Sequence, residues 1–314
     1  MRLPNLILAG APKCGTSSLF SWLVAHPEVC GSSPKETFYF MDANNPLLNS
    51  MANYHHHGLD HYASFFQDCP QTKILLEGTT HYIYQETALD FFAAAEPQPY
   101  IVFVLRKPSE QIFSSFSYTQ NNLARLEKDI SFAQFADLLL QGRIEQLEDR
   151  CHSEKSFFVL KNQLLYARYY DFIARWAERF PPERLRIIVF EQMKADPRTT
   201  LRCLASDLGI DSDFYNLFDF HKKNQTVAIQ NSFIHRNLRK VAPYLPAGAL
   251  KAALKSFYFR VQLKNSSASS FDPEPLRRLD DYFVPYNRQL AEVFDLNLEC
   301  WGWLKFLQRI GIDR

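Results

Sequence analysis

Four short apolar runs punctuate this chain of 314 residues. Runs of this length and composition are typical of strands that are buried on both faces of a parallel sheet. The runs cover residues 5–10, 73–78, 100–106 and 185–191.

Between these runs, apolar residues recur every three or four positions, as they do along a helix packed on a core. These patterns cover residues 17–26, 108–118, 162–180 and 197–208. Strands that alternate with helices predict a three-layer α/β/α fold around a central, mostly parallel sheet. Ligands of such sheets bind beyond the carboxyl ends of the strands.

Three segments are less regular, and they cover residues 42–70, 119–156 and 222–272. No linker-like stretch divides the chain, and 46% of its residues are apolar, so we expect a single domain over residues 1–314 with a large core. The irregular segments are then candidates for a variable wall of the binding site, since loops on a rigid scaffold carry specificity.

Charge and composition exclude several classes of partner. The net charge of +1 offers no bulk attraction to a nucleic acid, and no apolar run reaches the length of a membrane span. The start "MRLPNLILAGA" imitates a secretory signal, but its apolar core is short, so we interpret it as the first strand.

The cysteines lack paired or metal-type spacing, which favours six reduced thiols and a cytoplasmic location. They are Cys14, Cys30, Cys69, Cys151, Cys203 and Cys300.

The stretch "GAPKCGTSS" (10–18) joins the first run to the first helical pattern. Its two glycines match the frame of the phosphate-cradling loop G-x-x-x-x-G-K-[ST], but Thr16 occupies the lysine position and Lys13 stands upstream. The fit to a third phosphate is therefore lost, whereas a helix N-terminus still holds a single phosphate. Lys13 beside such a phosphate can neutralise its bridging oxygen as a transferable group leaves, without a metal.

These residues resemble the sulfotransferases that use 3′-phosphoadenosine 5′-phosphosulfate (PAPS). In that family a segment like "PKCGTSSL" (12–19) binds the 5′-phosphosulfate, and the lysine that matches Lys13 assists departure of the nucleotide. The resemblance implies a P-loop NTPase-like sulfotransferase fold. It also implies that PAPS, the sulfuryl donor, is bound by Lys13, Cys14, Gly15, Thr16, Ser17 and Ser18.

Two further segments carry the resemblance. "VLRKPSEQIFSSF" (104–116) is similar to the family element in which a strand-end arginine and a serine bind the 3′-phosphate, here Arg106 and Ser114. "HPEVCGSSPKETFYF" (26–40) is similar to a segment of carbohydrate-type and bacterial members, in which the glutamate matching Glu36 is the proposed base. Weaker matches cover residues 75–84, 167–210, 221–225 and 279–303.

The chain also departs from the family pattern. Gly78 and Thr80 stand where many relatives have lysine and proline. The late loop that completes the 3′-phosphate site in many members is not recognisable. The candidates to replace it are Arg236, Arg239 and Lys240.

Several residues keep two interpretations. Glu36 is either the base or the partner of Lys35 in a surface ion pair, and His81 competes with it as the base. Tyr169 and Tyr170 either reach the adenine, as a tyrosine does in relatives, or pack in the core. The stretch "YHHHGLDH" (54–61) suggests a metal, but no nearby Cys or Glu completes a familiar ligand set, so we expect none.

The sequence therefore predicts an enzyme that moves a sulfuryl group from PAPS to a hydroxyl of a sugar or another alcohol, without a metal; an amine acceptor is the lesser alternative. Glu36 is the expected base and Lys13 stabilises the leaving nucleotide. One rival is an ATP-dependent kinase with a degenerate loop, in which Glu77 or Glu191 would hold magnesium. The other is a nucleotide-binding module that has lost catalysis.

Overall fold

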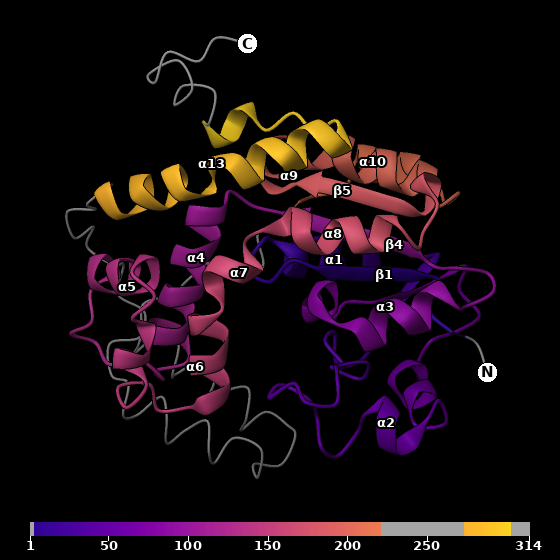
Figure 1. The fold of residues 1–314 in the computed structure, drawn as a ribbon. Helices are drawn as coiled ribbons and strands as arrows, with labels where there is room; N and C mark the ends of the chain where they lie inside the picture. The colour runs from indigo at the N-terminus through magenta and orange to yellow at the C-terminus, as the bar shows by residue number, and fades with distance from the viewer. Residues whose placement is uncertain (1–2, 221–272, 303–314) are drawn as a thin grey trace, which may run out of the picture. The chain divides into compact units, whose positions relative to one another are not determined.

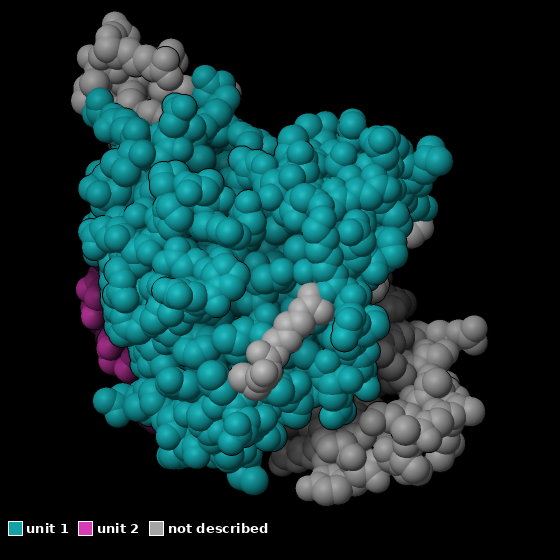
Figure 2. Space-filling model, turned by 90° about the vertical axis from the view of Figure 1, so that its right-hand side faces the viewer, with its two compact units in different colours: residues 1–111, 165–224, 280–314 teal, residues 112–164, 225–279 magenta. Residues whose placement is uncertain are grey.

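A computed structural model describes residues 3–220 and 273–302 of the chain. Its contacts group the residues into two compact units, coloured separately in Figure 2. The first unit holds residues 1–111, 165–224 and 280–314, and the second holds residues 112–164 and 225–279. The predicted variable segment 222–272, with Arg236, Arg239 and Lys240, and the stretch 221–225 lie outside the described residues.

The first unit is built on a five-stranded sheet in the order β2-β3-β1-β4-β5, and every pairing in it is parallel (Figure 1). The strand order turns back beside β1, so the carboxyl end of β1 opens at the point where α/β sheets bind ligands. The predicted α/β class is thus confirmed. The strands are β1 (Leu6–Gly10), β2 (Val29–Gly31), β3 (Ile74–Glu77), β4 (Tyr100–Leu105) and β5 (Leu185–Val189).

Strands β1, β3, β4 and β5 confirm that the four apolar runs form strands. The side chains of β1 and β3 are wholly buried and those of β4 nearly so, as expected, whereas β5 lies at the edge of the sheet and only Ile188 and Val189 of it are buried. Strand β2 was not predicted. It has three residues, "VCG", which are too few to leave a recognisable pattern.

In the first unit, strands and helices alternate along most of the chain, as the sequence predicted. The expected single helix over residues 162–180 is wrong, because it breaks into α7 and α8 around Arg168. The helices are α1 (Thr16–Val24), α2 (Tyr54–His57), α3 (Glu86–Ala93), α8 (Tyr169–Ala177), α9 (Phe190–Ala195) and α10 (Pro197–Asp207), with short 3₁₀ turns at Tyr62–Phe66, Thr80–Tyr84, Pro182–Arg184, Ser212–Asn216 and Glu299–Trp301.

The second unit contains residues 119–156, one of the three segments that the sequence shows as less regular, and this segment forms two helices and two short turns. Its helices α5 and α6 each begin after a serine whose hydroxyl accepts a backbone N–H, which is the usual helix cap. Rings of Phe116, Phe132 and Phe135 pack together in its core. Its elements are a π turn (Tyr118–Asn122), α5 (Phe132–Leu140), a 3₁₀ turn (Ile144–Leu147) and α6 (Glu154–Lys161); α4 (Pro108–Ser117), α7 (Gln163–Tyr166) and α13 (Glu274–Phe294) each have residues in both units.

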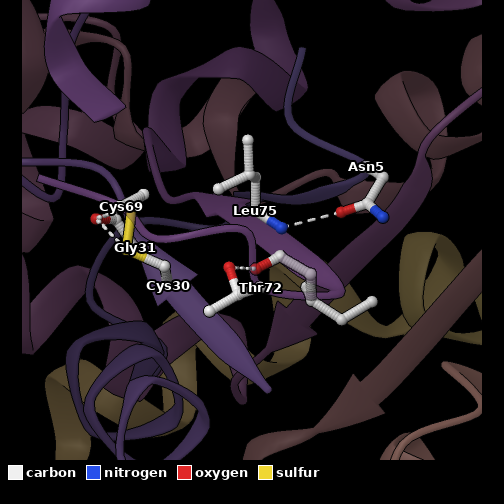
Figure 3. Close-up of a disulfide and its surroundings, with 7 residues drawn as sticks. Asn5, Cys30, Gly31, Cys69, Thr72 and Leu75 are labelled. Atoms are coloured by element: carbon white, nitrogen blue, oxygen red, sulfur yellow. Dashed lines mark hydrogen bonds between the residues drawn. A yellow bond between two sulfur atoms is a disulfide. The ribbon is translucent and has the colours of Figure 1, made fainter. Parts of the chain in front are cut away.

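Cys30 and Cys69 form a disulfide, so the expectation of six reduced thiols is wrong for this pair (Figure 3). The two cysteines are 39 residues apart in sequence: Cys30 lies in β2, and Cys69 lies between the 3₁₀ turn Tyr62–Phe66 and β3, which pairs with β2. The backbone N–H of Ser33 donates to the oxygen of Phe65 at 2.8 Å, which holds the two segments together. Figure 3 also shows Asn5 next to β3, where its side-chain oxygen accepts the N–H of Leu75 at 2.8 Å. The other four cysteines are free thiols. Among the described helices, none is long and apolar enough to cross a bilayer.

Candidate functional site

The loop after β1 owes its shape to glycine. Gly15 has a φ of +85° and directly precedes helix α1. A Cβ atom on Gly15 would lie 2.6 Å from ring carbons of Phe190, so no larger residue fits there. The N-terminal N–H groups of α1 therefore lie at the carboxyl end of the central strand, where they can bind an anion. The predicted hydroxyl residues Thr16, Ser17 and Ser18 are the first three of this helix.

Lys13 lies in the same loop, with its own backbone in the left-handed region. Burial lowers the pKa of its ammonium group to about 8; the carboxylate of Glu36 opposes this shift, and the guanidinium of Arg106 adds to it. Lys13, Glu36 and Arg106 come from three distant segments, and these effects show that the first unit brings them within electrostatic reach of one another.

Arg106 directly follows β4, as the sequence predicted. Its guanidinium lies over the ring of Phe190 at 5.1 Å and donates to Glu110 Oε2 at 2.9 Å. Its Nε atom is buried and has no hydrogen-bond partner among the described residues. A donor of this kind suits an anionic ligand. The second predicted residue, Ser114, is a half-buried residue of α4 and belongs to the second unit.

Cys14 belongs to the same loop, but its side chain is fully buried. Its sulfur lies 3.7 Å from the hydroxyl of Tyr169. Burial raises the pKa of the thiol to about 12, so Cys14 packs as a neutral group. The Tyr169 hydroxyl donates to the backbone oxygen of Arg106 at 3.0 Å. Tyr169 is thus a core residue that ties the loop to the end of β4, and Tyr170 has its ring near that of Phe294.

Glu36 does form the ion pair that a surface interpretation expects. Its Oε1 atom accepts a hydrogen bond from Lys35 Nζ at 2.9 Å, and the same ammonium group donates to the backbone oxygen of Gly78 at 3.0 Å. The Thr80 hydroxyl lies 3.4 Å from Oε2. The side chain of Glu36 is 30% exposed, which leaves it open to a substrate.

His81 is buried, within electrostatic reach of Glu36. It is 8% exposed, and burial lowers the pKa of its imidazole to about 4, against the opposing charge of Glu36. Its Nδ1 atom has no hydrogen-bond partner in the described part of the chain. At neutral pH the imidazole is therefore uncharged.

A family model of the sulfotransferase domain matches residues 3–292. The chain belongs to the sulfotransferase family. This membership supports sulfuryl transfer as the general chemistry of the site.

Several curated proteins resemble this sulfotransferase-family chain. Human bifunctional heparan sulfate N-deacetylase/N-sulfotransferase 3 is 28% identical over 234 residues, which cover 70% of this chain and 24% of the human protein. The mouse bifunctional enzyme 4 is 25% identical over 219 residues, covering 66% and 22%. The chain thus spans about a quarter of the length of these relatives. A solved sulfotransferase from Alicyclobacillus acidocaldarius has the same fold, with a TM-score of 0.63 and 19% identity over 96% of this chain and 99% of that one.

The two glutamates of the kinase alternative have other partners in this sulfotransferase fold. Glu191 accepts the backbone N–H of Lys107 at 3.1 Å on one oxygen and the indole N–H of Trp301 at 2.8 Å on the other. Glu77 is wholly buried and binds two threonines through one oxygen. The sequence analysis considered Glu77 only as a magnesium ligand and did not predict its hydrogen bonds to threonines. The signal in the sequence was a glutamate at the end of a buried strand, followed by two threonines.

The side chains of the histidine-rich stretch (54–61) contact other parts of the described chain. No group of three or more His, Cys, Asp or Glu side chains there is arranged to hold a metal. His55 instead bonds the backbone oxygen of Met41 at 2.9 Å, and the rings of His57 and His61 lie 5.5 Å apart.

Proposed function

We propose that this chain transfers the sulfuryl group of PAPS to a hydroxyl or amine of a carbohydrate or another small acceptor. The observation that carries the proposal is the convergence of Lys13, Glu36 and Arg106, seen in their effects on the pKa of Lys13. Membership of the sulfotransferase family supports the reaction class. We further propose that residues 1–314 act as one sulfotransferase domain.

In the proposed reaction, the acceptor atom attacks sulfur in line while the bond from sulfur to the 5′-phosphate oxygen breaks. The carboxylate of Glu36 takes the acceptor proton, and the ammonium of Lys13 stabilises the charge that develops on the leaving phosphate. Arg106 and Ser114 bind the 3′-phosphate. The phosphosulfate is bound by the backbone and side chains of the loop, namely Lys13, Cys14, Gly15, Thr16, Ser17 and Ser18.

No metal takes part in this scheme. The positive end of helix α1 and the charges of Lys13 and Arg106 supply the electrostatic stabilisation, and the fixed loop supplies orientation. Both effects resemble those that dominate phosphoryl transfer.

We assign the base to Glu36 rather than to His81. Glu36 is part-exposed and has hydrogen-bond partners on both oxygens, whereas His81 is almost fully buried and so less accessible to an acceptor. The ring of His81 instead packs near those of Phe38 and Tyr84.

A carbohydrate acceptor is supported by the relatives, whose names specify a heparan sulfate N-sulfotransferase. An N-sulfotransferase acts on an amine, so both hydroxyl and amine acceptors are to be tested. The cytoplasmic location expected from six reduced thiols no longer follows, because the disulfide between Cys30 and Cys69 is typical of an oxidising compartment.

Ligand binding tests the donor. We expect 3′-phosphoadenosine 5′-phosphate (PAP) to raise the melting temperature without magnesium, and to do so more than 5′-AMP does. Stabilisation only by Mg-ATP would support the kinase instead. Binding of PAP without transfer of ³⁵S label from PAPS to de-N-sulfated heparin, glucosamine or simple alcohols would support the inactive module.

Variants of the two candidate bases test the mechanism. We expect Glu36→Gln to lower kcat about 10²- to 10⁴-fold, because it removes the proton acceptor without changing the size of the side chain. The matched variant His81→Gln should lower kcat less than about tenfold, since in the proposed scheme the buried imidazole does not take the acceptor proton. The reverse ranking would assign the base to His81.

A further inference from the structure

The backbone that follows Glu36 is held by side chains rather than by a neighbouring strand. The N–H groups of Thr37 and Phe38 donate to the hydroxyl of Thr79 at 2.8 and 3.1 Å. The N–H groups of the next two residues, 39 and 40, donate to the hydroxyl of Tyr82 at 3.1 and 3.3 Å. Buried N–H groups need partners, and here two hydroxyls serve four successive ones.

Glu77 accepts hydrogen bonds from both Thr79 and Thr37. It is the last residue of β3 and is 0% exposed. Its Oε1 atom accepts from the hydroxyl of Thr79 at 2.6 Å, from the N–H of Thr79 at 3.2 Å and from the hydroxyl of Thr37 at 3.1 Å. The Thr37 hydroxyl also lies 3.0 Å from that of Tyr82. One carboxyl oxygen therefore connects the end of the central sheet to the residue directly after Glu36.

This arrangement has a cost that the fold alone does not explain. Burial raises the pKa of Glu77 to about 7, against the hydrogen bonds from Thr79 and Thr37. A carboxyl group is expensive to bury, and its second oxygen has no partner among the described residues. An apolar side chain would fill the same space more cheaply, but it would leave both threonines without their acceptor.

We infer that Glu77 is a positioning residue for Glu36, acting through Thr79 and Thr37. The inference rests on the proposed function, in which Glu36 is the base. Among the described residues, Glu36 itself has only Lys35 and Thr80 as side-chain hydrogen-bond partners, and the Lys35 pair is part-exposed. Its direction is therefore set by the backbone on either side, and misplacement of about 1 Å can lower a rate about 10²-fold.

The experiment compares Glu77→Ala with Glu77→Gln. The glutamine keeps an oxygen for the threonine donors, whereas the alanine removes it. With PAPS as donor and de-N-sulfated heparin as the probe acceptor, we expect Glu77→Ala to lower kcat about 10- to 100-fold and Glu77→Gln less than about threefold. The dissociation constant of PAP, measured by calorimetry, should stay within about twofold in both, because the hydrogen bonds of this network, as described above, link residues 37–40 to residues 77, 79 and 82 and not to the loop at residues 10–18.

Hydrogen exchange gives a readout that needs no acceptor. The amides of residues 37–40 should exchange faster in Glu77→Ala, while those of strands β1 and β4 keep the wild-type rate. Faster exchange throughout the sheet would show a merely structural role and overturn the inference. Wild-type exchange at residues 37–40 would overturn it as well.

A milder pair of variants covers the case in which Glu77→Ala does not fold. Tyr82→Phe removes the hydroxyl that serves residues 39 and 40, and should repeat both effects more weakly. Tyr84→Phe is the matched control, because its hydroxyl bonds the backbone oxygen of Tyr166 at 3.3 Å, outside this segment. Equal kcat in the two variants would contradict the inference. Absence of any sulfate transfer by the wild type would instead contradict the proposed function, and the exchange data would still decide on Glu77.

Discussion

The anion loop (residues 10–18) and the base segment (residues 35–40) hold the two ends of the proposed reaction by opposite means. The loop is shaped by its own backbone, with Gly15 fitted against Phe190 and helix α1 starting directly after it. The base segment is shaped by side chains about forty positions away, chiefly Glu77, Thr79 and Tyr82.

This difference decides what each region tolerates. A backbone-defined anion site depends on a few positions where only glycine fits, and neighbouring side chains tune it. A segment held by hydroxyls and one carboxyl depends on a buried polar network, in which loss of a single member leaves others unsatisfied. The two regions should therefore respond differently to substitution.

The largest effect is expected in the anion loop. Lys13→Ala should lower kcat about 10²- to 10³-fold, because it removes a positive charge from the site where the leaving phosphate becomes negative. The affinity for PAP should fall far less, since the helix N-terminus and Arg106 remain. Steady-state kinetics with PAPS and calorimetry with PAP measure the two quantities. Wild-type kcat in Lys13→Ala would remove Lys13 from the mechanism.

The same contrast explains which features of the fold and of the site could be predicted from the sequence. Strands β1, β3, β4 and β5 were predictable because each is a short and mostly apolar run, and the loop was predictable because its glycines and lysine lie within six residues of sequence. The family match to residues 3–292 agrees with the resemblance built on those segments.

The missed features all depend on contacts between distant segments. Strand β2 pairs with β3 and the disulfide joins Cys30 to Cys69, and nothing in their spacing indicates either contact. The role of Glu77 depends on Thr37, forty positions earlier. The break between α7 and α8 was missed because no glycine or proline marks it.

The next effect concerns the base segment and appears in stability. Burial raises the pKa of Glu77 from 4.5 to about 7. Between these two pH values the folded chain binds more protons than the unfolded chain, so the free energy of unfolding should fall as pH rises. The expected loss between pH 4.5 and pH 7 is about 3 kcal/mol for this group. Denaturant unfolding at several pH values measures it.

Glu77→Gln supplies the control for that measurement. Its amide does not titrate, so the difference in unfolding free energy between variant and wild type should grow in favour of the variant as pH rises. A difference that stays constant from pH 4.5 to pH 8 would show that Glu77 keeps an ordinary pKa in the folded chain.

The smallest effect returns to the anion loop and concerns the pH dependence of activity. Burial lowers the pKa of Lys13 to about 8, so the charged form that the mechanism needs is lost as pH rises through that value. The pH dependence of kcat/KM for PAPS reports the pKa values of the free enzyme. The value of kcat/KM should therefore fall to half near pH 8 and fall further above it. The kcat profile should stay level to higher pH, because the bound anion favours the charged lysine. Lys13→Arg should abolish the fall in kcat/KM, since a guanidinium keeps its proton, even though its absolute rate is lower. An unchanged fall near pH 8 in Lys13→Arg would assign that titration to another group and separate the low pKa of Lys13 from its role in the reaction.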